Sequence, residues 1–61
     1  MKFQDFIKTL DKDIRVEIYE WESGDIKYNG RLRNLTYFPD KVSRIIPQRT
    51  SREIYLEIYV Y

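Results

Sequence analysis

The chain contains no cysteine and no histidine. Without cysteine it can form no disulfide, and without either residue it lacks the ligands of the usual zinc sites. The same absences exclude Ser-His-Asp and Cys-His catalysis, because both need an imidazole base. The only two glycines, Gly24 and Gly30, are too few for a glycine-rich phosphate loop. We therefore expect a protein that works by binding, with no enzymatic activity, no metal and no cofactor.

Long apolar stretches are also missing, since no run approaches the ~20 residues that a membrane-spanning helix needs. The first residues lead into an amphipathic segment and not into the apolar core of a signal peptide, so we expect a cytoplasmic protein without membrane contact. The 61 residues predict one small domain, residues 1–61. Such a chain buries only ~60% of the surface that it exposes when unfolded. Without a disulfide, it needs a dense core or an oligomer.

The clearest pattern in the sequence lies in its last ten residues, 52–61. Aliphatic residues alternate there with acidic and aromatic ones. Because successive side chains of a strand point to opposite faces, this alternation predicts a strand with one side on a core. The aliphatic side consists of Ile54, Leu56, Ile58 and Val60, and the other side of Glu53, Tyr55, Glu57, Tyr59 and Tyr61.

The first half of the chain predicts a helix and a hairpin. In residues 3–10 the apolar positions recur at helical spacing, so this segment predicts an amphipathic helix that covers the core. Residues 14–19 and 26–33 alternate as strands, and the turn at 22–25 contains Gly24, which tolerates a positive φ. Gly30, inside the second strand, indicates a bulge, a bend or the close approach of another backbone.

The second half predicts two further strands. Residues 34–40 predict a loop with a short 3₁₀ piece, in which Leu35 and Phe38 cap one end of the core. Residues 41–46 predict the third strand, with a bulge near Ser43 and Arg44 to repair its imperfect alternation. Residues 47–51 predict a turn before the last strand.

These elements predict an α+β fold, α-β-β-β-β. In it a short N-terminal helix packs on a four-stranded, mostly antiparallel sheet arranged as a meander. A sheet bent toward an SH3-like barrel is the alternative. In either case strand edges are exposed, and the last strand is long and apolar. Because such an edge invites pairing with another chain, we expect a homodimer.

Charge is unevenly distributed along the chain. Residues 1–25 carry a net charge of −3, and residues 26–52 carry +6, although the whole chain is nearly neutral at +1. Arginine forks chelate phosphate oxygens and aromatic rings stack on bases or fill protein pockets. The basic middle therefore predicts a binding surface on the outer sheet face, formed by Tyr19, Trp21, Arg31, Arg33, Tyr55 and Tyr59.

Two other interpretations of these cations stay open. Arg44, Arg49 and Arg52 lie around the third strand and its turn, and they could instead hold an anion. Alternatively, the basic residues could serve only the fold, with Glu17 and Glu57 opposite Arg31 or Arg33 as cross-strand pairs.

The stretch FIKTLDKDIRVEIYEWESGDIKYNGRLRNL resembles the first half of small proteins of unknown function from phages and prophages of Gram-positive bacteria. The later segments KVSRI and EIYLEIYV are also similar to strands of those proteins. The resemblance implies a helix-plus-sheet fold and a phage-type accessory protein in the host cytoplasm, and it supplies no catalytic residues.

The leading hypothesis is a non-enzymatic phage-type protein that binds a host protein, such as a defence enzyme, and inhibits it by occlusion. The first alternative is a sponge that sequesters an anionic nucleotide signal. The second is a weak binder of single-stranded nucleic acid.

Overall fold

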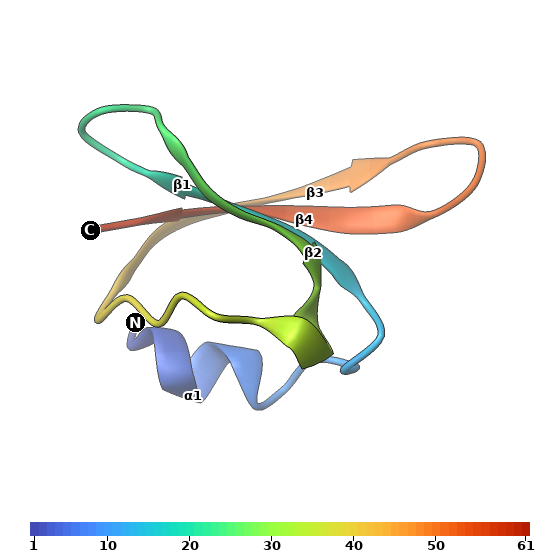
Figure 1. The fold of residues 1–61 in the computed structure, drawn as a ribbon, viewed down its shortest axis with the longest axis horizontal. Helices are drawn as coiled ribbons and strands as arrows, with labels where there is room; N and C mark the ends of the chain where they lie inside the picture. The colour runs from blue at the N-terminus through green and yellow to red at the C-terminus, as the bar shows by residue number, and fades with distance from the viewer.

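The computed structural model describes residues 1–61 as one helix, one 3₁₀ turn and a four-stranded sheet (Figure 1). The helix and 3₁₀ turn lie on the same side of the sheet. No helix is long and apolar enough to cross a membrane. In chain order the elements are α1 (Phe3–Ile7), β1 (Arg15–Glu20), β2 (Ile26–Arg31), η1 (Leu32–Asn34), β3 (Val42–Arg49) and β4 (Ile54–Val60).

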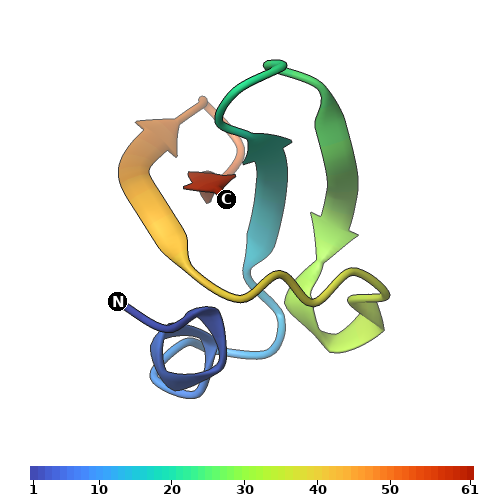
Figure 2. The same cartoon turned by 90° about the vertical axis from the view of Figure 1, so that its left-hand side faces the viewer.

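The predicted α+β class, with a short helix on a mostly antiparallel sheet, is confirmed, but the meander is wrong. The strand order is β2-β1-β4-β3, so the last strand lies inside the sheet and runs parallel to β1. The outer pairs, β1 with β2 and β3 with β4, are antiparallel. The sheet is curved, but β2 and β3 stay at opposite edges and it does not close into a barrel (Figure 2).

The interior position of β4 follows from its composition. Leu56, Ile58 and Val60 are all buried, and Ile58 and Val60 are completely inaccessible to solvent. A strand with neighbours on both sides buries such residues best and leaves no backbone groups unpaired. The last strand therefore has no free edge at which a second copy could pair, and the expectation that it does is wrong. The homodimer stays a prediction without that support.

Both real edges carry features that hinder pairing with another chain. In β3, Pro47 lacks an N–H to donate, and the predicted bulge is confirmed by a register shift between Val42 and Arg44. The N-terminal residues cover the start of this edge, since the Val42 N–H donates to the Met1 carbonyl at 2.9 Å. In β2, the Tyr28 hydroxyl donates to the Arg31 carbonyl at 2.6 Å.

The core lies between the sheet and the segments beneath it. Phe3 and Ile7 of α1 pack against the inner residues of β1 and β4, and no polar side chain is buried. Partly buried residues, including Leu10 and Leu35, surround this cluster. The buried residues of the core are Phe3, Ile7, Val16, Ile18, Leu32, Val42, Leu56, Ile58 and Val60.

Several local predictions need correction. The helix ends at Ile7 and not at Leu10, because the chain continues as a turn in which the Leu10 N–H donates to the Ile7 carbonyl at 3.2 Å. The 3₁₀ turn is Leu32–Asn34, earlier than predicted. β3 continues through Pro47 to Arg49, which an edge strand permits. Phe38 does not cap the core, since it is 57% exposed.

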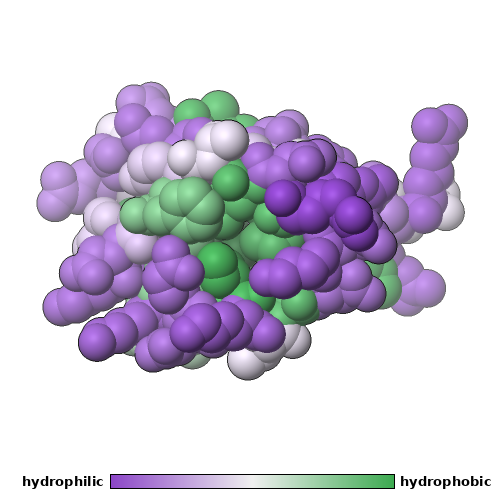
Figure 3. Space-filling view, turned by 60° about the horizontal axis from the view of Figure 1, so that its bottom comes forward, coloured by the Kyte–Doolittle hydropathy of each residue, from purple (hydrophilic) through white to green (hydrophobic).

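Phe38 lies at a shallow apolar hollow on the helical side of the molecule. Ile7, Leu32, Leu35 and Phe38 line it, with Lys12 and Arg33 beside them. Figure 3 shows this side of the protein, where an apolar strip is bordered by hydrophilic side chains.

The two glycines have separate roles. Gly24 has a φ of +75°, which confirms the predicted turn. Gly30 has no bulge, because the register shift of this hairpin lies between Ile18 and Tyr19. A Cβ on Gly30 would lie 2.9 Å from the Tyr28 hydroxyl oxygen. The predicted close approach of another backbone is therefore wrong, since a side chain fills this space.

Alanine substitutions of two isoleucines in β4 test the packing of the core. We expect Ile58→Ala to lower the free energy of unfolding by about 2–5 kcal/mol, because it leaves a cavity in the core. The matched variant Ile54→Ala, at a position that is 59% exposed, should change it by about 0.5 kcal/mol or less. Urea denaturation followed by circular dichroism measures both. Equal effects of the two variants would contradict the burial of Ile58 in the core.

Candidate binding surface on the outer face of the sheet

The outer face is the side of the sheet that points away from α1. Alternate residues of each strand are buried in the core, so the residues between them point outward. The cross-strand register then fixes their neighbours, and Arg44, Tyr59 and Tyr19 form one such row. The outer face comprises Arg15, Glu17 and Tyr19 of β1, Asn29 and Arg31 of β2, Arg44, Ile46 and Gln48 of β3, and Tyr55, Glu57 and Tyr59 of β4.

Two carboxylates lie side by side at the centre of this face. Glu17 and Glu57 are direct neighbours on the parallel strands, an arrangement that is unfavourable unless each charge is compensated. Glu17 accepts hydrogen bonds from Arg15 Nη2 at 2.5 Å and from the Tyr19 hydroxyl at 2.8 Å. Glu57 accepts them from Gln48 Nε2 at 2.8 Å and from the Tyr59 hydroxyl at 3.1 Å. These bonds hold the surrounding side chains in fixed positions.

The tyrosines and Trp21 form the aromatic platform, defined here as Tyr19, Trp21 and Tyr59. The rings of Tyr19 and Tyr59 stack with centroids 5.3 Å apart, and Trp21 meets Tyr59 edge-on at 6.0 Å. The Trp21 N–H also donates to the Val60 carbonyl at 2.8 Å, which fixes its backbone beside β4. Trp21 nevertheless remains 48% exposed. The structure therefore brings together three of the six predicted binding residues.

The carboxylates change the acidity of the platform. The hydrogen bond to Glu17, burial and the charges of Glu17 and Glu57 raise the pKa of Tyr19 from its ordinary value near 10 to about 12. The hydrogen bond to Glu57 likewise raises the pKa of Tyr59. Both phenols are therefore neutral hydrogen-bond donors throughout the physiological pH range.

The other predicted binding residues lie toward the opposite end of the sheet. The guanidinium of Arg15 sits over the Tyr55 ring, 4.7 Å from its centroid, as a cation–π contact. Arg31 lies beside Arg15 across the β1–β2 pair. Arg33 belongs to η1 and not to the outer face, and it forms an ion pair with Asp13.

The predicted pairing of Glu17 or Glu57 with Arg31 or Arg33 is wrong. Glu17 pairs with Arg15 of its own strand, whereas Arg31 pairs with Glu53 at 2.9 Å. The prediction missed Arg15 and Glu53, although alternation places Arg15 on the outer side of its strand. Their partners depend on the strand order, which the sequence pattern does not encode.

The three arginines of the alternative anion site do not come together. Arg44 lies next to Tyr59, whereas Arg49 and Arg52 line a hollow at the β3–β4 turn. Arg49 lies five positions after Arg44, which corresponds to ~16 Å along a strand. None of the three forms an ion pair, which leaves their charges available to a ligand.

The chain has no match among protein-family models, curated proteins or solved structures.

The raised pKa values predict a late ionisation of two of the six tyrosines. In an alkaline titration followed by absorbance at 295 nm, Tyr19→Phe should remove the latest step, near pH 12. Because its folded pKa exceeds the unfolded value near 10, Tyr19 stabilises the fold below pH 10, and this contribution is lost as the pH rises to 12. Ionisation of Tyr19 near pH 10 would contradict its hydrogen bond to Glu17.

Proposed function

We propose that this chain is a non-enzymatic, phage-type accessory protein that binds a host protein and inhibits it by occlusion. The observation that carries this proposal is the exposed aromatic platform next to Arg44, a cation without an acidic partner. Tyrosine, tryptophan and arginine are the residues most enriched at the energetic centres of protein interfaces. The resemblance to small phage proteins supports the biological setting.

The rigidity of the platform favours tight binding. The two tyrosines are held by hydrogen bonds to Glu17 and Glu57 and by stacking on one another. Side chains that are already ordered lose little conformational entropy when a partner docks on them. Their hydroxyls are occupied, so these rings offer mainly apolar surface, and Arg44 supplies the charge.

The size of the outer face also suits an occluding protein. The molecule exposes 4320 Å² in total. A standard protein interface buries ~800 Å² on each partner, which is roughly a fifth of this surface. Because Arg44 is unpaired, the complementary surface on the host protein should carry an acidic group beside an apolar pocket.

A second candidate function is binding of single-stranded nucleic acid. The platform beside Arg44 is also an arrangement in which a base can stack while a phosphate meets the guanidinium. Affinity for such a ligand would fall steeply with salt, because binding releases counterions. The nucleotide-sponge hypothesis has less support, since Arg44 lies far along β3 from Arg49 and Arg52.

The experiment compares affinity capture from host lysate by the wild-type chain and by the double variant Trp21→Ala, Arg44→Ala. We expect a protein captured by the wild type to be lost from the double variant, and the purified pair to weaken about 30-fold or more, since a central contact contributes ~2 kcal/mol or more. The matched control Lys8→Ala changes an exposed cation of the helical side and should bind normally. Equal capture by both variants would refute the proposal, and a salt-sensitive complex with an oligonucleotide would favour the second candidate.

A further inference from the structure

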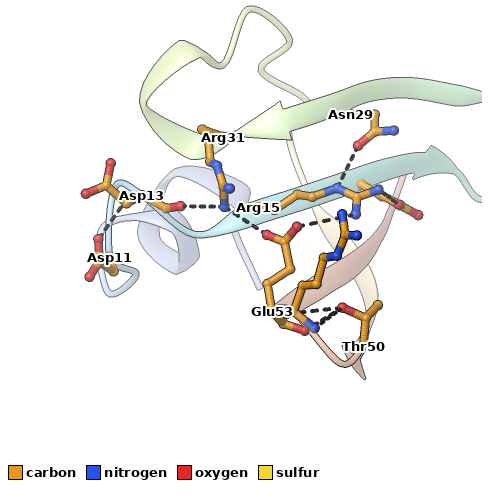
Figure 4. Close-up of polar contacts among 9 residues, drawn as sticks. Asp11, Asp13, Arg15, Asn29, Arg31, Thr50 and Glu53 are labelled. Carbon is orange, nitrogen blue, oxygen red and sulfur yellow. Dashed lines mark hydrogen bonds and ion pairs between the residues drawn. The ribbon is translucent and has the colours of Figure 1, made fainter.

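Arg15 and Arg31 face each other across β1 and β2, with a single carboxylate between them (Figure 4). Two like charges in this position repel. Glu53, at the start of β4, compensates them: its Oε1 lies 2.9 Å from Arg31 Nη1, and its Oε2 lies 3.9 Å from Arg15 Nη1. The carboxylate of Glu53 therefore acts as an internal anion for this arginine pair.

Arg31 retains hydrogen-bonding capacity that the fold does not use. Its Nη1 donates both to Glu53 and to the Asp13 carbonyl, the latter at 3.1 Å. Its Nε and Nη2 donate to no protein group, and the side chain is 51% exposed. Arg15, in contrast, is engaged by Glu17, Asn29 and the Tyr55 ring. The free donors of Arg31 match the two oxygens of a carboxylate or phosphate.

Glu53 also borders two adjacent hollows of the surface. Arg31 and Ile14 line the first, together with Asp11 and Asp13. Arg49, Thr50, Ser51 and Arg52 line the second, and both hollows include Glu53 and Ile54. The second hollow contains two arginines and only Glu53 as an acid, so it carries an excess of positive charge.

The acids of the first hollow are already engaged. Asp13 is paired with Arg33, and Asp11 Oδ1 accepts the Asp13 N–H at 2.8 Å. These acids repel an anion, whereas Arg49 and Arg52 of the adjacent hollow attract one.

The side chain of Glu53 can move without unfolding the turn. Its backbone is fixed, because its N–H donates to the Thr50 hydroxyl at 3.1 Å and its carbonyl accepts the Thr50 N–H at 2.9 Å. The carboxylate itself is held only by the two arginines, and the side chain is 31% exposed. Exchange of this carboxylate for another anion requires only side-chain rotation.

We propose that Arg31 forms a site for a dianionic phosphate group and that Glu53 occupies this site in the free protein. Arg49 and Arg52 line the adjacent hollow and add positive charge near it. A phosphate displaces the Glu53 carboxylate and takes its place next to Arg31. The two negative charges of the ligand complement the surplus of arginines. This site lies at the opposite end of the sheet from the aromatic platform and does not depend on the proposed protein partner.

The test uses Glu53→Gln, which keeps the shape of the side chain but removes its charge. Inorganic phosphate is titrated at constant ionic strength, with chloride as the replaced anion, and the Arg31 Nε–Hε resonance is followed by NMR. We expect Glu53→Gln to bind phosphate at least tenfold more tightly than the wild type, because the internal competitor is gone. In chloride alone its melting temperature should fall by a few degrees, and phosphate should restore it.

The matched controls separate a site from a general salt effect. Glu53→Gln, Arg31→Gln should lose the tight binding, whereas Glu53→Gln, Arg33→Gln should keep it. Equal phosphate affinity in the wild type and Glu53→Gln would overturn the proposal, as would equal losses from the two arginine changes. Each variant is first checked for a native amide spectrum.

Titration with AMP and adenosine identifies the source of the phosphate group. Binding of AMP but not of adenosine supports recognition of a nucleotide phosphate, and binding of inorganic phosphate alone supports recognition of the free ion. Binding of adenosine as tight as that of AMP would overturn the site, because the charge would then be irrelevant. Trp21→Ala, Arg44→Ala should leave all these affinities unchanged, which keeps this result separate from that of the protein partner.

Discussion

The pairing of β1 with β4 is the constraint on which the rest of the molecule depends. The two strands run in parallel and in register, so Val16 meets Leu56 and Ile18 meets Ile58 on the core side. The same register places Glu17 beside Glu57 and Tyr19 beside Tyr59 on the outer side. One pairing therefore builds both the buried centre and the candidate binding surface. A shift by one residue would exchange these two faces, so the surface and the core are specified together.

Compensation of the charges on the outer face holds its side chains in place. The outer face contains acids and arginines in close contact, and the tyrosine hydroxyls and Gln48 complete the bonds of Glu17 and Glu57. At the end of the sheet, Glu53, the residue before β4, compensates Arg15 and Arg31. Arg44, Arg49 and Arg52 form no ion pair: Arg44 lies near the start of β3, and Arg49 and Arg52 lie at its end and in the turn that follows. The chain is nearly neutral in total, but it has two separate groups of unpaired arginines. One lies beside the aromatic platform, and the other lines the hollow at the β3–β4 turn.

Local patterns in the sequence predicted much of the fold. Alternation identified the buried residues of β1 and β4, but it also placed Ile54 on the core, and Ile54 is 59% exposed. The irregular spacing of Val42, Ile45 and Ile46 predicted the bulge that the structure contains. Strand order was not predictable in this way, because the pairing of β1 with β4 joins distant parts of the chain. For the same reason the outer face was predicted but the partners of its charges were not. Phe38 was misplaced because apolar character alone does not show that the core has room for a side chain.

The interior position of β4 has a consequence for how the chain folds. Arg15 pairs with Tyr55, 40 residues later, and the two hairpins are joined in the sheet by the pairing of β1 with this last strand. A long loop must close, with a loss of chain entropy, before contacts between distant residues can stabilise the fold. Such proteins therefore fold more slowly than proteins with mainly local contacts. During synthesis the first hairpin and α1 would leave the ribosome without the strand that completes their core. The fold can therefore be completed only once β4 has been synthesised and has left the ribosome.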